Sequence, residues 1–294
     1  MPPATPEQIH IDVGDAELGV VRWLGAPGAP LVVAVHGITA NAWSWAAVAR
    51  LLDGEIGLAA VDLRGRGAST GAPGPFGIRR HADDVATVIE KLSAAPAVVA
   101  GHSMGAFVAL ACAERHPAAV GPLVLVDGGV PLPVPGGMSS DAVLDALLGP
   151  SIERLRTVWP DRVSYRTMWS EHPAFATGLT PELERYVLSD LVPTDGGFRS
   201  SVNEQAVRTD GAELLTDPDV RSLLDRRAEP ATIVRAEYGL NGAPPPLIPL
   251  VAIGRYSGHD WRNLPGTNHY SVLFDDGGAE AVATALRQAA AILA

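Results

Sequence analysis

Four short runs of apolar and β-branched residues most constrain the fold of this chain. Each run is continuous rather than alternating, as expected of a strand buried on both faces of a parallel sheet. Stretches with helical spacing separate the runs, and the clearest of these covers residues 76–93. This alternation predicts a mostly parallel sheet with right-handed crossovers. The runs are APLVVAVHG (29–37), GLAAVDLRG (57–65), PAVVA (96–100) and GPLVLVDGG (121–129).

The alternation stops after Gly129 and resumes about ninety residues later. Residues 130–218 hold short helical patterns rich in aromatic residues and no strand run of comparable quality. The chain therefore reads as one α/β core, formed by 1–129 and 219–294, with a helical insertion over 130–218. The remaining expected elements are strands at 8–13, 17–24, 230–237 and 259–265, and helices at 42–52, near 245–256 and over 277–293.

Composition and charge exclude several classes of function. The net charge of the 294 residues is −11 and no basic run occurs, which argues against nucleic acid as a partner. The single cysteine, Cys112, cannot form an internal disulfide or a cysteine-based zinc site, and we expect neither metal nor cofactor. The N-terminus lacks a leader pattern and no apolar stretch reaches membrane-spanning length, so we expect a cytoplasmic protein without stable membrane association.

The segment GHSMG, residues 101–105, lies where a predicted strand meets a predicted helix. Gly-x-Ser-x-Gly in this context is typical of a nucleophile elbow. Glycine at both flanking positions removes side chains that would collide where strand and helix pass close together. The strained turn would project the hydroxyl of Ser103 above the sheet edge. We therefore predict that Ser103 is a nucleophile.

Four motifs in this order resemble those of the α/β-hydrolase family, and the resemblance covers nearly all of the chain. It implies an α/β-hydrolase fold, a helical lid over 130–218 inserted after strand six, and catalysis by a Ser-His-Asp triad without a cofactor. The motifs are His36-Gly37 in the oxyanion loop, DLRGRGAS (62–69) after the fourth strand, the elbow at 101–105, and Asn268-His269-Tyr270 at the place of the family's histidine.

The resemblance also implies the other catalytic groups. His269 would be the general base, and the backbone N–H groups of Ile38 and Met104 would form the oxyanion hole. Met104 would stand at a helix N-terminus, where the helix dipole favours a developing negative charge.

The acid of the triad has two candidates. In most of the family it follows the seventh strand, where Glu237 stands about two positions early and Gly239 is near the expected aspartate. In lipases of the pancreatic type and some lactone hydrolases it follows strand six, where Asp127 stands 127 − 103 = 24 residues after the serine. We favour Asp127 and keep Glu237 as the alternative.

Residues near these motifs, together with aromatic residues of the insertion, are the candidates for the substrate pocket. Helical lids in this position usually cover the carboxyl ends of the strands. The candidate lining residues are His36, Gly37, Trp43, Trp159, Tyr165, Trp169 and Tyr270.

These features predict a hydrolase that cleaves a carboxylic ester or lactone of an apolar small molecule. One alternative is hydrolysis of a C–C bond in a ring-cleavage product, whose carboxylates would need an arginine in the pocket. Another is a ligand receptor built on a hydrolase scaffold, which could retain the triad. The arginines that keep the C–C alternative open are Arg154, Arg156, Arg162 and Arg166.

Overall fold

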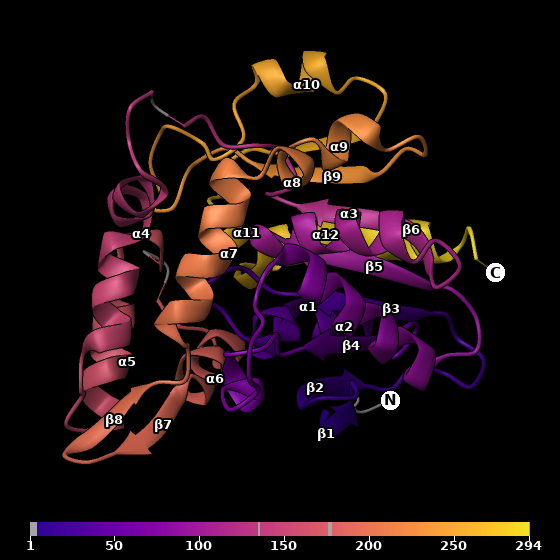
Figure 1. Cartoon of the computed structure of the whole chain (residues 1–294). Helices are drawn as coiled ribbons and strands as arrows, with labels where there is room; N and C mark the ends of the chain where they lie inside the picture. The colour runs from indigo at the N-terminus through magenta and orange to yellow at the C-terminus, as the bar shows by residue number, and fades with distance from the viewer. Residues whose placement is uncertain (1–4, 135, 176–177, 294) are drawn as a thin grey trace.

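The computed structural model describes residues 5–134, 136–175 and 178–293. An eight-stranded sheet runs through the core in the order β1-β2-β4-β3-β5-β6-β9-β10 (Figure 1). The β1–β2 and β2–β4 pairs are antiparallel and all other neighbours are parallel, as the strand–helix alternation predicted. The strands are β1 (Glu7–Asp12), β2 (Glu17–Trp23), β3 (Leu31–Val35), β4 (Gly57–Val61), β5 (Ala97–His102), β6 (Val120–Val126), β9 (Thr232–Ala236) and β10 (Asp260–Leu264).

Helices cover both faces of this sheet. Side chains of α2 (Ile78–Leu92) and α3 (Met104–Arg115) belong to one core cluster, and those of α1 (Ala46–Leu52) and α12 (Asp276–Ala290) belong to the other. Strand β3 alternates between the two clusters: Val33 and Val35 face the first, whereas Val32 and Ala34 face the second. Burial on both faces explains why these strands read as unbroken apolar runs.

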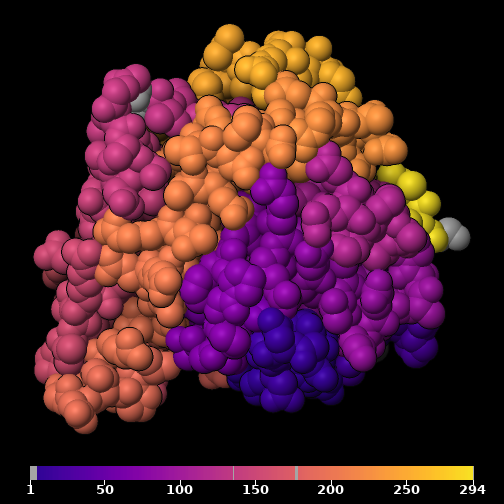
Figure 2. Space-filling view, in the orientation of Figure 1, coloured from indigo at the N-terminus to yellow at the C-terminus, as the bar shows by residue number. Residues whose placement is uncertain are grey.

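The segment between β6 and β9 is mostly helical and packs against the core (Figures 1 and 2). It also holds a β-hairpin that we did not expect, because each of its strands has only four residues. Asp195-Gly196 forms the two-residue turn of this hairpin. This dipeptide is typical of hairpin turns and was the sequence feature that could have predicted it. The elements are α4 (Ser140–Arg156), α5 (Arg162–Ser170), η3 (Pro173–Phe175), α6 (Pro181–Ser189), β7 (Leu191–Thr194), β8 (Gly197–Ser200), α7 (Glu204–Thr216), α8 (Pro218–Arg221) and α9 (Leu223–Arg226).

The helix expected near 245–256 is much shorter than predicted. Only α10 (Val251–Arg255) forms, because prolines 244–246 and Pro249 lack the N–H groups that a helix needs. The other short elements are η1 (Ala42–Trp45), η2 (Gly67–Ser69) and α11 (Ser271–Phe274). Among the helices of the described residues, none combines the length and hydrophobicity needed to span a membrane.

Candidate active site

The turn that carries Ser103 lies between β5 and α3 and is strained. Ser103 adopts φ 55° and ψ −119°, in the half of backbone space that residues with a side chain rarely occupy. A Cβ on Gly101 would lie 2.1 Å from the Gly105 carbonyl oxygen, and one on Gly105 would lie 2.3 Å from that of Val35. The glycines of the motif are therefore required by close backbone packing on both sides of the serine.

His269 follows β10 and contacts Asp127, which follows β6. Its Nδ1 lies 2.7 Å from Asp127 Oδ2, and both residues are buried. A carboxylate only accepts, so Nδ1 carries the proton and Nε2 is left as an acceptor. The Ala236 N–H donates to Asp127 Oδ1 at 3.1 Å, which orients the carboxylate from the neighbouring strand β9. His269 and Ser103 line the same pocket.

Glu237, the alternative acid, lies elsewhere. Its Oε2 accepts a hydrogen bond of 2.7 Å from the Gly266 N–H, at an exposed turn after β10. The carboxylate that holds the imidazole is therefore that of Asp127, and Glu237 stabilises a turn of the loop that leads to His269.

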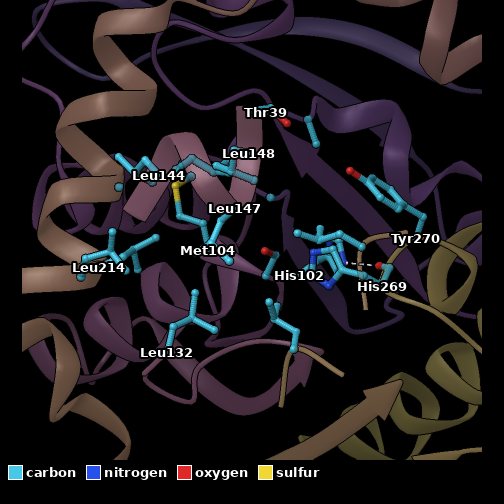
Figure 3. Close-up of a pocket in the computed structure, with 18 of the residues that line it drawn as sticks. Thr39, His102, Met104, Leu132, Leu144, Leu147, Leu148, Leu214, His269 and Tyr270 are labelled. Carbon is cyan, nitrogen blue, oxygen red and sulfur yellow. Dashed lines mark hydrogen bonds between the residues drawn. The ribbon is translucent and has the colours of Figure 1, made fainter. Parts of the chain in front are cut away.

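Two residues beside the proposed triad hold the His269 loop in place. His102 Nε2 donates to the His269 carbonyl oxygen at 2.9 Å, the contact drawn as a dashed line in Figure 3. Burial lowers the pKa of His102 well below its usual value, so this ring is neutral. The Asn268 side-chain oxygen accepts from the N–H groups of Tyr270 and Ser271, both at 2.9 Å. The motif Asn268-His269-Tyr270 did not by itself distinguish this capping role from a pocket position.

Two backbone N–H groups lie in the same pocket as Ser103, one from the loop after β3 and one from the start of α3. Ile38 lies in this loop and Met104 begins α3, and both line the pocket. Within the described chain, neither N–H donates a hydrogen bond to another residue. An acceptor bound next to Ser103 could therefore receive both bonds.

Comparison with known proteins identifies the family of this chain. A model of the family described as "Alpha/beta hydrolase family" matches residues 32–285. The chain belongs to the alpha/beta hydrolase family. Family membership and the relatives below support hydrolase activity on a small molecule.

The similar proteins differ in the substrates their names state. The chain is 28% identical to the 2-(acetamidomethylene)succinate hydrolase of Mesorhizobium japonicum over 78% of this chain and 77% of that protein. It is 36% identical to Lipase LipV of Mycobacterium tuberculosis over 45% of this chain, an alignment that spans only 48% of the lipase. A crystal structure of E-2-(acetamidomethylene)succinate hydrolase has the same fold, with a TM-score of 0.78 and 23% identity over 97% of this chain and 99% of that one.

Leucine is the commonest residue in the pocket lining of this alpha/beta hydrolase. The cavity measures about 730 Å³, including the part open to solvent. Leu144, Leu147 and Leu148 of α4 lie across it from His102 and His269 (Figure 3). Their i, i+3, i+4 spacing was the sequence signal for this wall. The other lining leucines are Leu132, Leu214, Leu215, Leu240 and Leu247.

Only part of the predicted pocket lines this cavity. Gly37 and Tyr270 do, as do the two predicted oxyanion donors, whereas five pocket candidates do not: His36, Trp43, Trp159, Tyr165 and Trp169.

The other five candidates lie outside this cavity. His36 is fully buried beneath the oxyanion loop. Trp43 packs edge-on against Trp23, with ring centroids 5.8 Å apart. Trp159, Tyr165 and Trp169 form edge-to-face contacts with one another within the insertion. Large aromatic rings gain more from such interlocking contacts than leucines do, which explains why they occupy the insertion's own core.

His36 makes the stability of the enzyme depend on pH. Burial lowers its pKa to about 3, so the unfolded chain binds a proton more readily than the folded one. The stability that its neutral ring contributes is present above pH 6.5 and is lost as the pH falls toward 3. We expect this group to cost about 2 kcal/mol of unfolding free energy between pH 6.5 and pH 5.

Urea denaturation at the two pH values measures this effect. His36→Asn keeps a donor for the Gly37 carbonyl but does not titrate, so its unfolding free energy should fall less on acidification than that of the wild type. His10→Asn, at an exposed position, is the control and should follow the wild type. Equal pH dependence of His36→Asn and wild type would contradict the prediction.

Proposed function

We propose that the protein is a serine hydrolase that cleaves a carboxylic ester or lactone of an apolar small molecule. The observation that carries this proposal is the 2.7 Å contact between His269 and Asp127, in the pocket shared by His269 and the strained Ser103. No metal or cofactor takes part in the proposed reaction.

In the first half of the proposed reaction, Ser103 Oγ forms a bond to the substrate carbonyl carbon while His269 Nε2 takes the hydroxyl proton. Asp127 stabilises the resulting imidazolium, and the N–H groups of Ile38 and Met104 stabilise the oxyanion. The bond to the alcohol oxygen then breaks and His269 returns the proton to it. Water, activated by His269, hydrolyses the acyl-enzyme and releases the acid.

The pocket lining supports a neutral, apolar substrate. Eight of its nineteen described lining residues are leucines, and no arginine or lysine is among the nineteen. A substrate carboxylate would therefore be buried without a counter-charge, which is unfavourable. We also propose that residues 130–218 act as the lid, since α4 and α7 contribute five of these leucines.

The C–C hydrolase alternative has less support. This reaction requires a cationic group in the pocket to pair with the substrate's carboxylates. Binding of the succinate named for the Mesorhizobium relative would require one too. The candidate arginines are engaged elsewhere: Arg154 pairs with Asp190, Arg156 with Glu204 and Arg166 with Glu184, while Arg162 lies over the Phe198 ring.

A substrate panel tests the proposal. We expect p-nitrophenyl esters of apolar acids to be cleaved with a kcat/KM at least about 10²-fold above that for dienoic diketo acids or 2-(acetamidomethylene)succinate, given the cost of an unpaired buried carboxylate. Preferential cleavage of either carboxylate substrate would overturn the ester assignment.

A fluorophosphonate probe then tests the nucleophile and the receptor alternative. We expect one label per chain, on the peptide that contains Ser103, together with repeated turnover of the ester. A single stoichiometric burst followed by a persistent adduct would favour the ligand receptor. Absence of labelling would overturn the serine hydrolase.

A further inference from the structure

Three consecutive carbonyl oxygens of the oxyanion loop each accept a hydrogen bond from a buried side chain. His36 Nδ1 donates to the Gly37 oxygen at 2.7 Å. Arg66 donates to the Ile38 oxygen twice, from Nε at 3.1 Å and from Nη2 at 3.0 Å. Arg154 Nη2 donates to the Thr39 oxygen at 3.1 Å. These contacts hold the loop from the side of its carbonyl groups.

The two arginines are in turn held by carboxylates of the 130–218 segment. Arg66 is fully buried, and its Nη2 lies 2.6 Å from Oδ2 of Asp210 on α7. Arg154, on α4, pairs with Asp190 and lies 2.6 Å from the Tyr165 hydroxyl. The segment that carries the leucine wall is thus tied to the oxyanion loop in two ways: directly by the Arg154 bond to Thr39, and through Arg66 by its ion pair with Asp210.

Asp210 has further partners that keep it in place. Its Oδ1 accepts from the Gly77 N–H at 2.7 Å, and its Oδ2 lies 3.0 Å from His81 Nε2. Burial opposes its ionisation, but the charges of Arg66 and His81 lower the pKa of Asp210 to about 2. The next residue, Gly211, lines the substrate pocket.

Holding the carbonyl groups also sets the direction of the N–H groups. In a planar trans peptide the C=O and N–H bonds point in opposite directions. Fixing the Gly37 oxygen therefore fixes the N–H of Ile38, which belongs to the same peptide unit. Fixing the Ile38 oxygen holds the following peptide unit, so that Ile38 is held on both sides. Donors that are oriented before the substrate binds stabilise an oxyanion most effectively.

We propose that Arg66, held by Asp210 of α7, is a positioning residue that keeps the oxyanion loop preorganised, with Arg154 and Asp190 as a second anchor. This inference rests on the proposed serine hydrolase function. It makes α7 a determinant of turnover as well as of substrate fit, because the same helix carries Asp210 and pocket leucines.

Arg66→Lys and Arg64→Lys form a matched pair of test variants. Both arginines are fully buried and ion-paired, but the Arg64 side chain pairs with Asp84 and Asp15 and, among the described residues, makes no hydrogen bond or ion pair with loop 36–39. Lysine keeps a charge beside Asp210, yet its single ammonium cannot reproduce the two guanidinium bonds to the Ile38 oxygen. We expect Arg66→Lys to lower kcat by about 10- to 100-fold with KM within threefold, and Arg64→Lys to keep kcat within threefold.

A transition-state analogue separates positioning from general structural damage. An apolar trifluoromethyl ketone places an oxyanion in the hole once Ser103 adds to it, so its Ki should rise in Arg66→Lys by the same factor as kcat/KM falls. Its Ki should be unchanged in Arg64→Lys. Equal kcat losses in the two lysine variants, or an effect of Arg66→Lys on KM alone, would overturn the proposal.

If Arg66→Lys does not fold, Asp210→Asn and Asp84→Asn replace the pair, and kcat should fall only in Asp210→Asn. Stoichiometric fluorophosphonate labelling of Ser103 in each variant shows that the nucleophile remains competent. A wild-type protein that neither hydrolyses esters nor takes the label would instead refute the proposed function.

Discussion

Ser103→Ala is expected to lower kcat for an apolar ester by about 10⁴- to 10⁶-fold, the loss seen when the nucleophile of a triad is removed. The hydroxyl is the only protein group in the proposed reaction that forms a bond to the substrate, so His269 and the oxyanion hole retain a small activity at most. The unfolding free energy should change little, since alanine keeps the Cβ and meets the same strain at φ 55°.

Stopped-flow and steady-state assays on the same ester measure this loss, and the fluorophosphonate label should disappear with it. Ser170→Ala, on the exposed side of α5, is the control and should retain wild-type turnover. A Ser103→Ala protein that keeps more than a few per cent of the activity would mean that another residue is the nucleophile.

Asp127→Asn should lower kcat by about 10³- to 10⁴-fold, whereas Glu237→Gln should leave it within twofold. An asparagine amide can donate to Nδ1 of His269, which favours the tautomer whose Nε2 carries a proton and cannot accept one from Ser103. Asp127 adopts φ 41°, a conformation that asparagine tolerates, so the fold should persist.

The pH dependence of kcat/KM provides a second measurement for this pair. Glu237→Gln should keep the wild-type profile because its carboxylate contacts only the Gly266 turn. Asp127→Asn should recover part of its activity at high pH, where hydroxide can take the Ser103 proton in place of His269. The reverse outcome, with Glu237→Gln as the inactive variant, would make Glu237 the acid.

The core and the elbow were predictable because local physics determines both. Burial on two faces produces the continuous apolar runs of β3 to β6, and steric exclusion at Gly101 and Gly105 marks the bend around Ser103. The β7–β8 hairpin and the short α10 were missed or misjudged because four-residue strands and proline-rich turns leave weak periodic signals.

The pocket was the least predictable part. Tryptophan and tyrosine in the insertion suggested a binding wall. Instead, Tyr165 packs against both Trp159 and Trp169, and the buried Arg154 contacts Tyr165 and Trp169. The leucines of α4 and α7 became the wall because the helices turn that face toward Ser103. Helical spacing shows that a face is apolar, but it does not show which neighbour that face meets.

By itself, the sequence determined the α/β alternation and the strained serine turn, since each depends on residues close together in the chain. His269 was predicted from the family resemblance. Only the tertiary structure decided that the carboxylate beside His269 is that of Asp127, because β6 and β9 pair in parallel although about 110 residues separate them. The same non-local packing brings Arg66 and Asp210 together beneath the oxyanion loop. Contacts of this kind depend on the order of strands in the sheet, which short-range patterns do not encode.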